Sequence, residues 1–110
     1  MRIEFYKNDS LDKKCMEIVN LDSRTSQLLK AAEEPCELSR AVVRYLDNSN
    51  KDTLDNLLEE IADTIIIIKK LYMLLDKEIN PDVLDYLTSD WSIKKHAQLD
   101  EVISELKLNQ

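Results

Sequence analysis

Apolar side chains recur at three- and four-residue intervals over most of this chain, the spacing of one face of an α-helix. Residues 22–46 follow this spacing and predict one long helix, and residues 52–77 predict a second. Between them, residues 47–50 are Asp, Asn, Ser and Asn, all of which favour turns. The pattern therefore predicts two long antiparallel helices joined by a short turn.

Two prolines interrupt the helical pattern. Pro35 lies inside the first long helix, where a proline removes a backbone hydrogen bond at a cost of about 3 kcal/mol. We therefore expect a kink near residues 31–35, or a break. Pro81 follows Asn80 and ends the second long helix. Shorter helices are predicted at 9–20, capped by Asp9 or Ser10, at 82–87, and at 92–106, starting from Ser89 or Asp90.

The composition supports an all-α fold. The chain has 110 residues, of which 34% are charged and none is glycine. Sheet-rich proteins need tight turns, and glycine supplies most of them. We expect one helical domain over residues 1–110, a bundle built around the long hairpin. Helical chains of this size often bury too little apolar surface alone, so we expect oligomerisation to complete the bundle.

Charge and motif content exclude several classes of function. A net charge of −7 argues against nucleic-acid binding, which needs a basic surface. The apolar runs at 65–68 and 71–75 are too short to span a membrane, which takes about 20 residues. Without glycine there is no phosphate-binding loop, and the single His96 has no partner at zinc-ligand spacing. Cys15 and Cys36 form no paired motif, which is typical of a cytoplasmic protein with reduced thiols.

Four acidic residues stand out in the predicted hairpin. Glu34 and Glu37 are three residues apart, as are Glu60 and Asp63, so each helix presents two carboxylates on one face. In an antiparallel hairpin, residues equally far from the turn face each other. Glu34 pairs with Asp63, and Glu37 with Glu60, about the same midpoint in the turn. We therefore expect the four carboxylates to meet at one level.

Four close carboxylates repel one another and need a cation. Oxygen ligands favour Mg²⁺, with Mn²⁺ as a substitute. Such an ion completes its shell with water and substrate phosphates, so it would position a triphosphate for hydrolysis. The alternative is an ordinary solvated surface, because glutamate is a good helix former.

The same stretches resemble a known family. Residues 33–37 and 60–63 resemble the paired E-E-x-x-E and E-x-x-D motifs of the MazG-like all-α nucleotide pyrophosphohydrolases, and the resemblance extends over about residues 26–75. It implies a helical homodimer or homotetramer that hydrolyses a nucleoside triphosphate, NTP or dNTP, to the monophosphate and pyrophosphate with Mg²⁺. It also implies catalytic roles for Glu33, Glu34, Glu37, Glu60 and Asp63, the last four as metal ligands. Glu33 would orient a water or simply face solvent.

Several other residues are candidate substrate contacts. Gln27 and Lys70 should face each other two turns beyond the carboxylates, where Gln27 would touch the nucleotide and Lys70 a phosphate. Lys30 is a similar candidate. For all three, an ordinary solvated role is the simpler alternative. Trp91 would stack on a base or, more simply, pack in an interface.

The C-terminal helix motivates a different function. Many short members of the family carry several basic residues there, suited to phosphate contacts. Lys94 and Lys95 match this set, whereas Gln98 and Val102 stand where further basic residues would be expected. Together with Pro35 in the first motif, this favours a second hypothesis, a catalytically weakened module that binds a nucleotide or a protein. A purely structural bundle is the third.

Overall fold

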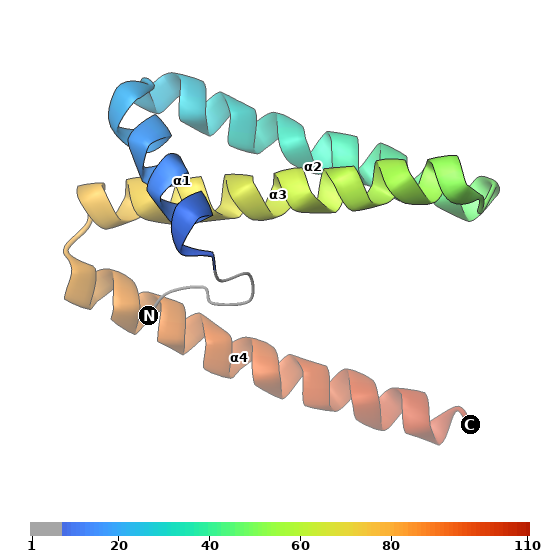
Figure 1. Ribbon diagram of the computed structural model, residues 1–110. Coiled ribbons are helices and arrows are strands. Elements are labelled where there is room, and N and C mark those ends of the chain that lie inside the picture. The colour runs from blue at the N-terminus through green and yellow to red at the C-terminus, as the bar shows by residue number, and fades with distance from the viewer. Residues whose placement is uncertain (1–7) are drawn as a thin grey trace.

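The computed structural model describes residues 8–110, which form helices and no strand (Figure 1). This confirms the predicted all-α class; residues 1–7 of the predicted domain lie outside the described part. The elements are α1 (Asp9–Leu21), α2 (Arg24–Asp47), α3 (Lys51–Glu78) and α4 (Pro81–Leu108).

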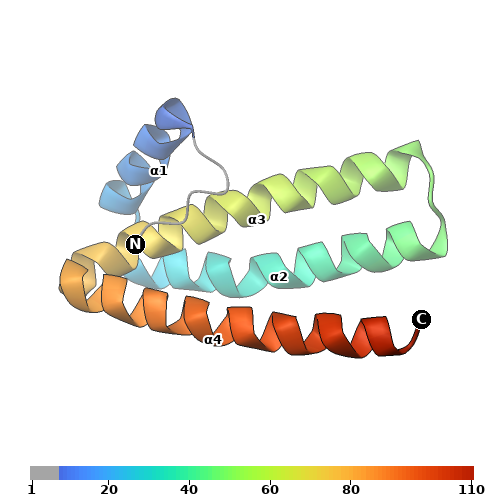
Figure 2. The same cartoon turned by 90° about the horizontal axis from the view of Figure 1, so that it is seen from below.

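Helices α2 and α3 pack against each other as the predicted antiparallel hairpin (Figures 1 and 2). The start of α3 is fixed by a capping box. The Asn50 side chain accepts a hydrogen bond from the Thr53 backbone at 3.0 Å, and the Thr53 hydroxyl accepts one from the Asn50 backbone at 3.0 Å. The Thr53 hydroxyl also donates to the Asn48 carbonyl at 2.7 Å. These bonds hold the turn without glycine.

Pro35 does not break α2, which is helical from Arg24 to Asp47. The predicted alternative of a break is therefore wrong. Pro35 cannot donate a hydrogen bond to the carbonyl of Ala31, at a cost of about 3 kcal/mol. Its ring is exposed, and the packing of α2 against α3 offsets the lost bond.

Helix α4 is continuous, so the predicted break between residues 87 and 92 is wrong. The polar residues there resemble a helix start but are satisfied within the helix. The Thr88 hydroxyl donates to the Leu84 carbonyl at 2.8 Å, and Asp90 forms an ion pair with Lys94 at 2.9 Å. The true start is Asn80, whose side chain accepts hydrogen bonds from the first turn.

Helix α1 packs across α3 and places Cys15 and Val19 in the small core. Its cap lies one or two residues earlier than predicted: Asn8, rather than Asp9 or Ser10, caps it by accepting a 3.0 Å hydrogen bond from the Leu11 backbone.

Helix α4 touches the hairpin near its own start, where the Tyr72 and Thr88 hydroxyls are hydrogen-bonded, and diverges from it towards the C terminus (Figure 1). It leaves several large apolar side chains exposed: Trp91, Ile93, Leu99, Val102, Ile103 and Leu106. Within residues 8–110, no helix has an apolar stretch long enough to cross a membrane.

Candidate metal centre

The hairpin brings carboxylates from both of its helices together. Oxygen atoms of Glu34 and Glu37 on α2 and of Glu60 on α3 all lie within 4.8 Å of one another. Asp63 belongs to an overlapping group, in which its oxygen, one of Glu60 and one of Glu59 satisfy the same 4.8 Å limit. Glu60 is common to both groups and therefore stands at the centre of the cluster.

Two carboxylate oxygens of these residues are hidden from solvent. Glu34 Oε1 and Glu60 Oε2 are buried, and neither receives a hydrogen bond in the described part of the chain. A buried carboxylate oxygen without a donor carries the full cost of desolvation. A water, a proton or a cation would offset this cost.

The surroundings of Glu34 favour its protonated form. Burial raises the pKa of the Glu34 carboxyl above its ordinary value of 4.5, and the negative charge of Glu37 raises it further. The neighbouring Glu60 and Asp63 carboxyls add to the increase. A cation would remove the same repulsion that the proton removes.

Glu59 is a member of the cluster that was not predicted from the sequence. It is exposed and precedes Glu60 on α3. The signal was present in its spacing, because residues 59 and 63 are four apart and share a helix face.

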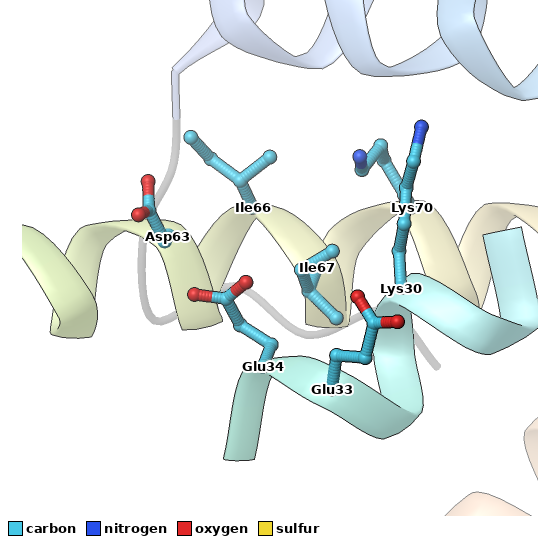
Figure 3. A pocket seen from close by; sticks show the side chains of 7 residues that line it. All are labelled: Lys30, Glu33, Glu34, Asp63, Ile66, Ile67 and Lys70. Carbon is cyan, nitrogen blue, oxygen red and sulfur yellow. The ribbon is translucent and has the colours of Figure 1, made fainter. Parts of the chain in front are cut away.

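An open pocket of about 240 Å³ lies on one side of the cluster (Figure 3). Glu34 and Asp63 stand at one end of it and Lys30 and Lys70 at the other. Ile66 and Ile67 form an apolar stretch between these ends, and Glu33 completes the lining. The Lys30 ammonium group lies 3.3 Å from the Asp22 carboxylate, so part of its charge is already neutralised.

A second pocket, of about 260 Å³, lies on the side of the cluster nearer the hairpin turn. Only polar and charged side chains line it: Glu37, Arg40 and Arg44 from α2, and Asn56 and Glu60 from α3. The two arginines and Asn56 were not predicted from the sequence. Their spacing from Glu37 and Glu60 is helical, but it indicates nothing until the two helices are placed together.

The remaining predicted contacts lie elsewhere. Gln27 is 7% exposed, and its amide donates to the carbonyls of Val19 at 3.2 Å and Asp22 at 3.0 Å. The simpler alternative for Gln27, a solvated side chain, is therefore wrong, because the α1–α2 corner closes over it.

Trp91, Lys94 and Lys95 form a separate cluster on α4. The Lys94 and Lys95 ammonium groups lie 4.8 and 5.9 Å from the centre of the Trp91 ring. None of these three residues is among those that line the pockets described beside the carboxylates.

Comparisons with protein-family models, with curated proteins and with solved structures found no match for this chain. Any inference about a bound ion therefore depends on the residues of this chain alone. The cluster offers carboxylate oxygens alone, and two of these are buried without a donor. Such a set fits a hard divalent cation better than zinc, which prefers nitrogen and sulfur ligands.

Proposed function

We propose that this protein is a Mg²⁺-dependent pyrophosphohydrolase, which cleaves an NTP or dNTP to the monophosphate and pyrophosphate. The observation that carries the proposal is the pair of buried oxygens of Glu34 and Glu60, which lack a donor within a cluster of like charges. The resemblance of residues 33–37 and 60–63 to the MazG-like motifs supports the same chemistry.

Glu34, Glu37, Glu60 and Asp63 would hold the ion, with Mn²⁺ as a substitute for Mg²⁺. A bound Mg²⁺ polarises phosphate oxygens and lowers the pKa of a coordinated water. Glu33 lines the same pocket as Glu34 and Asp63, and it would orient the attacking water by accepting its hydrogen bond. Lys30 and Lys70 line the far end of that pocket and would contact the substrate.

In the reaction, a water oxygen bonds to one of the two phosphorus atoms, α or β, that the bridging oxygen joins. The bond between that phosphorus and the bridging oxygen breaks, and the bridging oxygen keeps the electron pair. The water proton passes to a nearby carboxylate or to solvent. The products are a nucleoside monophosphate and pyrophosphate.

The test is release of pyrophosphate from a panel of NTPs and dNTPs with Mg²⁺, measured for the wild type, Glu60→Gln and Glu101→Gln. Glu101 is an exposed acidic residue on α4 and serves as the matched control. We expect Glu60→Gln to lose at least about 100-fold in kcat and Glu101→Gln to lose nothing. Turnover of no nucleotide by the wild type, or full activity of Glu60→Gln, would contradict the proposal.

A second candidate is a helical module that binds a nucleotide or a protein without turnover. It is favoured by the position of Lys94, Lys95 and Trp91, which form a cluster on α4 and are absent from the linings of the pockets described beside the carboxylates. Nucleotide binding without pyrophosphate release would support this alternative.

We also propose that the protein assembles with itself, as a homodimer or homotetramer in the cytoplasm. The exposed apolar side chains of α4, among them Leu99, Ile103 and Leu106, support this assembly because water covers them in a single chain. Both cysteines are free thiols, as a reducing compartment would keep them.

A further inference from the structure

Two of the pockets that border the cluster of carboxylates differ in character. The pocket on the Lys30 and Lys70 side contains the apolar surface of Ile66 and Ile67. The pocket on the turn side is lined by polar and charged side chains alone. A nucleoside triphosphate has a comparable asymmetry, with the flat aromatic faces of a base at one end and a chain of phosphates at the other.

Arg40 and Arg44 give the turn-side pocket positive charge that is not paired with a carboxylate in the described part of the chain. Both side chains are exposed, and within residues 8–110 neither forms an ion pair or a side-chain hydrogen bond. An arginine in the last turn of a helix, such as Arg44, is favoured by the helix dipole alone. Arg40 lies one turn earlier and lines the same pocket, so the dipole does not account for the pair.

Resting on the proposed function, we infer that Arg40 and Arg44 form the pyrophosphate subsite of this enzyme, with Asn56 as a neutral donor beside them. The guanidinium groups present forked N–H donors that match phosphate oxygens. From Glu37 to Arg44 the helix rises about 10 Å, so the arginines continue the groove outward from the carboxylates. The nucleoside then lies on the Ile66 and Ile67 side.

This orientation defines the path of the leaving group. When water attacks the α-phosphorus, the bond from that phosphorus to the bridging oxygen breaks, and the leaving pyrophosphate keeps the bridging oxygen and its electron pair. Arg40 and Arg44 stabilise this additional charge where it develops. The monophosphate stays in the opposite pocket, so the two products are held by different residues.

The test is calorimetric binding of pyrophosphate at a fixed concentration of Mg²⁺ to the wild type, Arg40→Gln and Arg44→Gln. Lys70→Gln tests the opposite orientation. Arg24→Gln is the matched control, because Arg24 pairs with Glu78 at the other end of the hairpin. We expect each of the two pocket variants to weaken pyrophosphate binding about 10-fold or more. Binding of a nucleoside monophosphate should be unchanged in both, as should pyrophosphate binding by Lys70→Gln and Arg24→Gln.

The outcomes separate this inference from the proposed function. If the protein hydrolyses nucleotides but both pocket variants bind pyrophosphate as the wild type does, the subsite is overturned and the function stands. The same holds if Lys70→Gln weakens pyrophosphate binding instead. Absence of hydrolysis, with pyrophosphate binding that depends on Arg40 and Arg44, would overturn the function and leave the subsite. If the wild type binds no pyrophosphate, the subsite is overturned directly. Mg²⁺ affinity, measured for each variant, and replacement of Arg40 by Lys check that any loss arises from the missing donors rather than from misfolding.

Discussion

Glu34 of α2 and Glu60 of α3 each keep one carboxylate oxygen out of solvent and without a hydrogen-bond donor. Their oxygens lie within 4.8 Å of one another, together with one from Glu37. In the metal-free protein the hairpin is therefore held together against a local repulsion. This conflict between packing and charge makes the cluster responsive to protons.

The first prediction concerns stability and pH in the metal-free protein. Because the pKa of Glu34 is raised in the folded state, this state takes up a proton more readily than the unfolded chain. The stabilisation of the folded state by this proton is fully present below pH 4.5, the ordinary pKa of the carboxyl, and is lost as pH rises through the folded-state pKa. With EDTA present, Glu34→Gln should therefore raise Tm by a few degrees at pH 7, and the gain should shrink towards pH 4.5.

Thermal unfolding of both proteins across this pH range measures the difference. The Ser26 hydroxyl lowers the pKa of Asp22, which gives that residue the opposite pH dependence. The Asp22 contribution is present above 3.8 and is lost as pH falls through the lowered value, so it lies below this pH range. An equal Tm for Glu34→Gln and wild type at pH 7 would show that no repulsion exists.

The second prediction concerns cation binding itself. Mg²⁺ should raise the unfolding free energy of the wild type, by about 2.7 kcal/mol when its concentration is 100 times Kd. Glu60→Gln should abolish the shift, because Glu60 belongs to both carboxylate groups. The affinity should weaken as pH falls, since the ion must displace the proton favoured on Glu34. Calorimetry and Tm at several Mg²⁺ concentrations test this, and a full Mg²⁺ shift in Glu60→Gln would contradict it.

The third prediction concerns the α1–α2 corner. Gln27→Ala should lower the free energy of unfolding by about 1–3 kcal/mol, because the carbonyls of Val19 and Asp22 would each lose a donor. Its Mg²⁺ affinity should not change, since Gln27 is outside both carboxylate groups. Chemical denaturation measures the loss, with the exposed Gln98→Ala as the control. Equal stability of the two variants would show that the Gln27 hydrogen bonds do not stabilise the fold.

The fourth prediction concerns Pro35. Replacement by alanine restores an N–H donor for the Ala31 carbonyl within α2. The change should raise the free energy of unfolding by about 1–2 kcal/mol, the net of a restored helix bond and a more flexible unfolded chain. Cys36→Ala, at the neighbouring exposed position, should change little. A less stable Pro35→Ala protein would mean that the ring itself packs favourably.

The fifth prediction concerns assembly. Ile103→Glu should shift the protein towards a smaller species in sedimentation analysis, because it puts a charge among the exposed apolar residues of α4. Ser104→Glu adds the same charge at the next position, about 100° around the helix, and should leave assembly intact. Loss of assembly in both variants, or in neither, would exclude this face as the contact.

The hairpin was predictable because its signals are local. The turn at residues 47–50 and the apolar spacing on either side define two helices, and the position of the turn determines which carboxylates can meet. The continuity of α4 was not predictable, because the bonds that satisfy Thr88 and Asp90 compete with capping and leave no distinct pattern. The burial of Gln27 was equally hidden, since it depends on how α1 turns back onto α2.

The site was predictable to a similar extent. Helical spacing and the midpoint of the turn indicate that Glu34, Glu37 and Glu60 converge. Exposed arginines, by contrast, are ordinary on a helix surface. The position of Arg40 and Arg44 beside Glu60 depends on the packing of one helix against the other.

The capping box between Asn50 and Thr53 also limits how this chain can change in length. Each residue added to or removed from a helix start rotates the rest of that helix by about 100° and moves it by about 1.5 Å. A residue inserted into α3 between Thr53 and Glu60 would therefore rotate Glu60 by about 100° relative to the cap and away from Glu34, even if every side chain were retained. The turn can accept new side chains that still cap α3, whereas a change in the number of residues between the cap and Glu60 would separate the carboxylates.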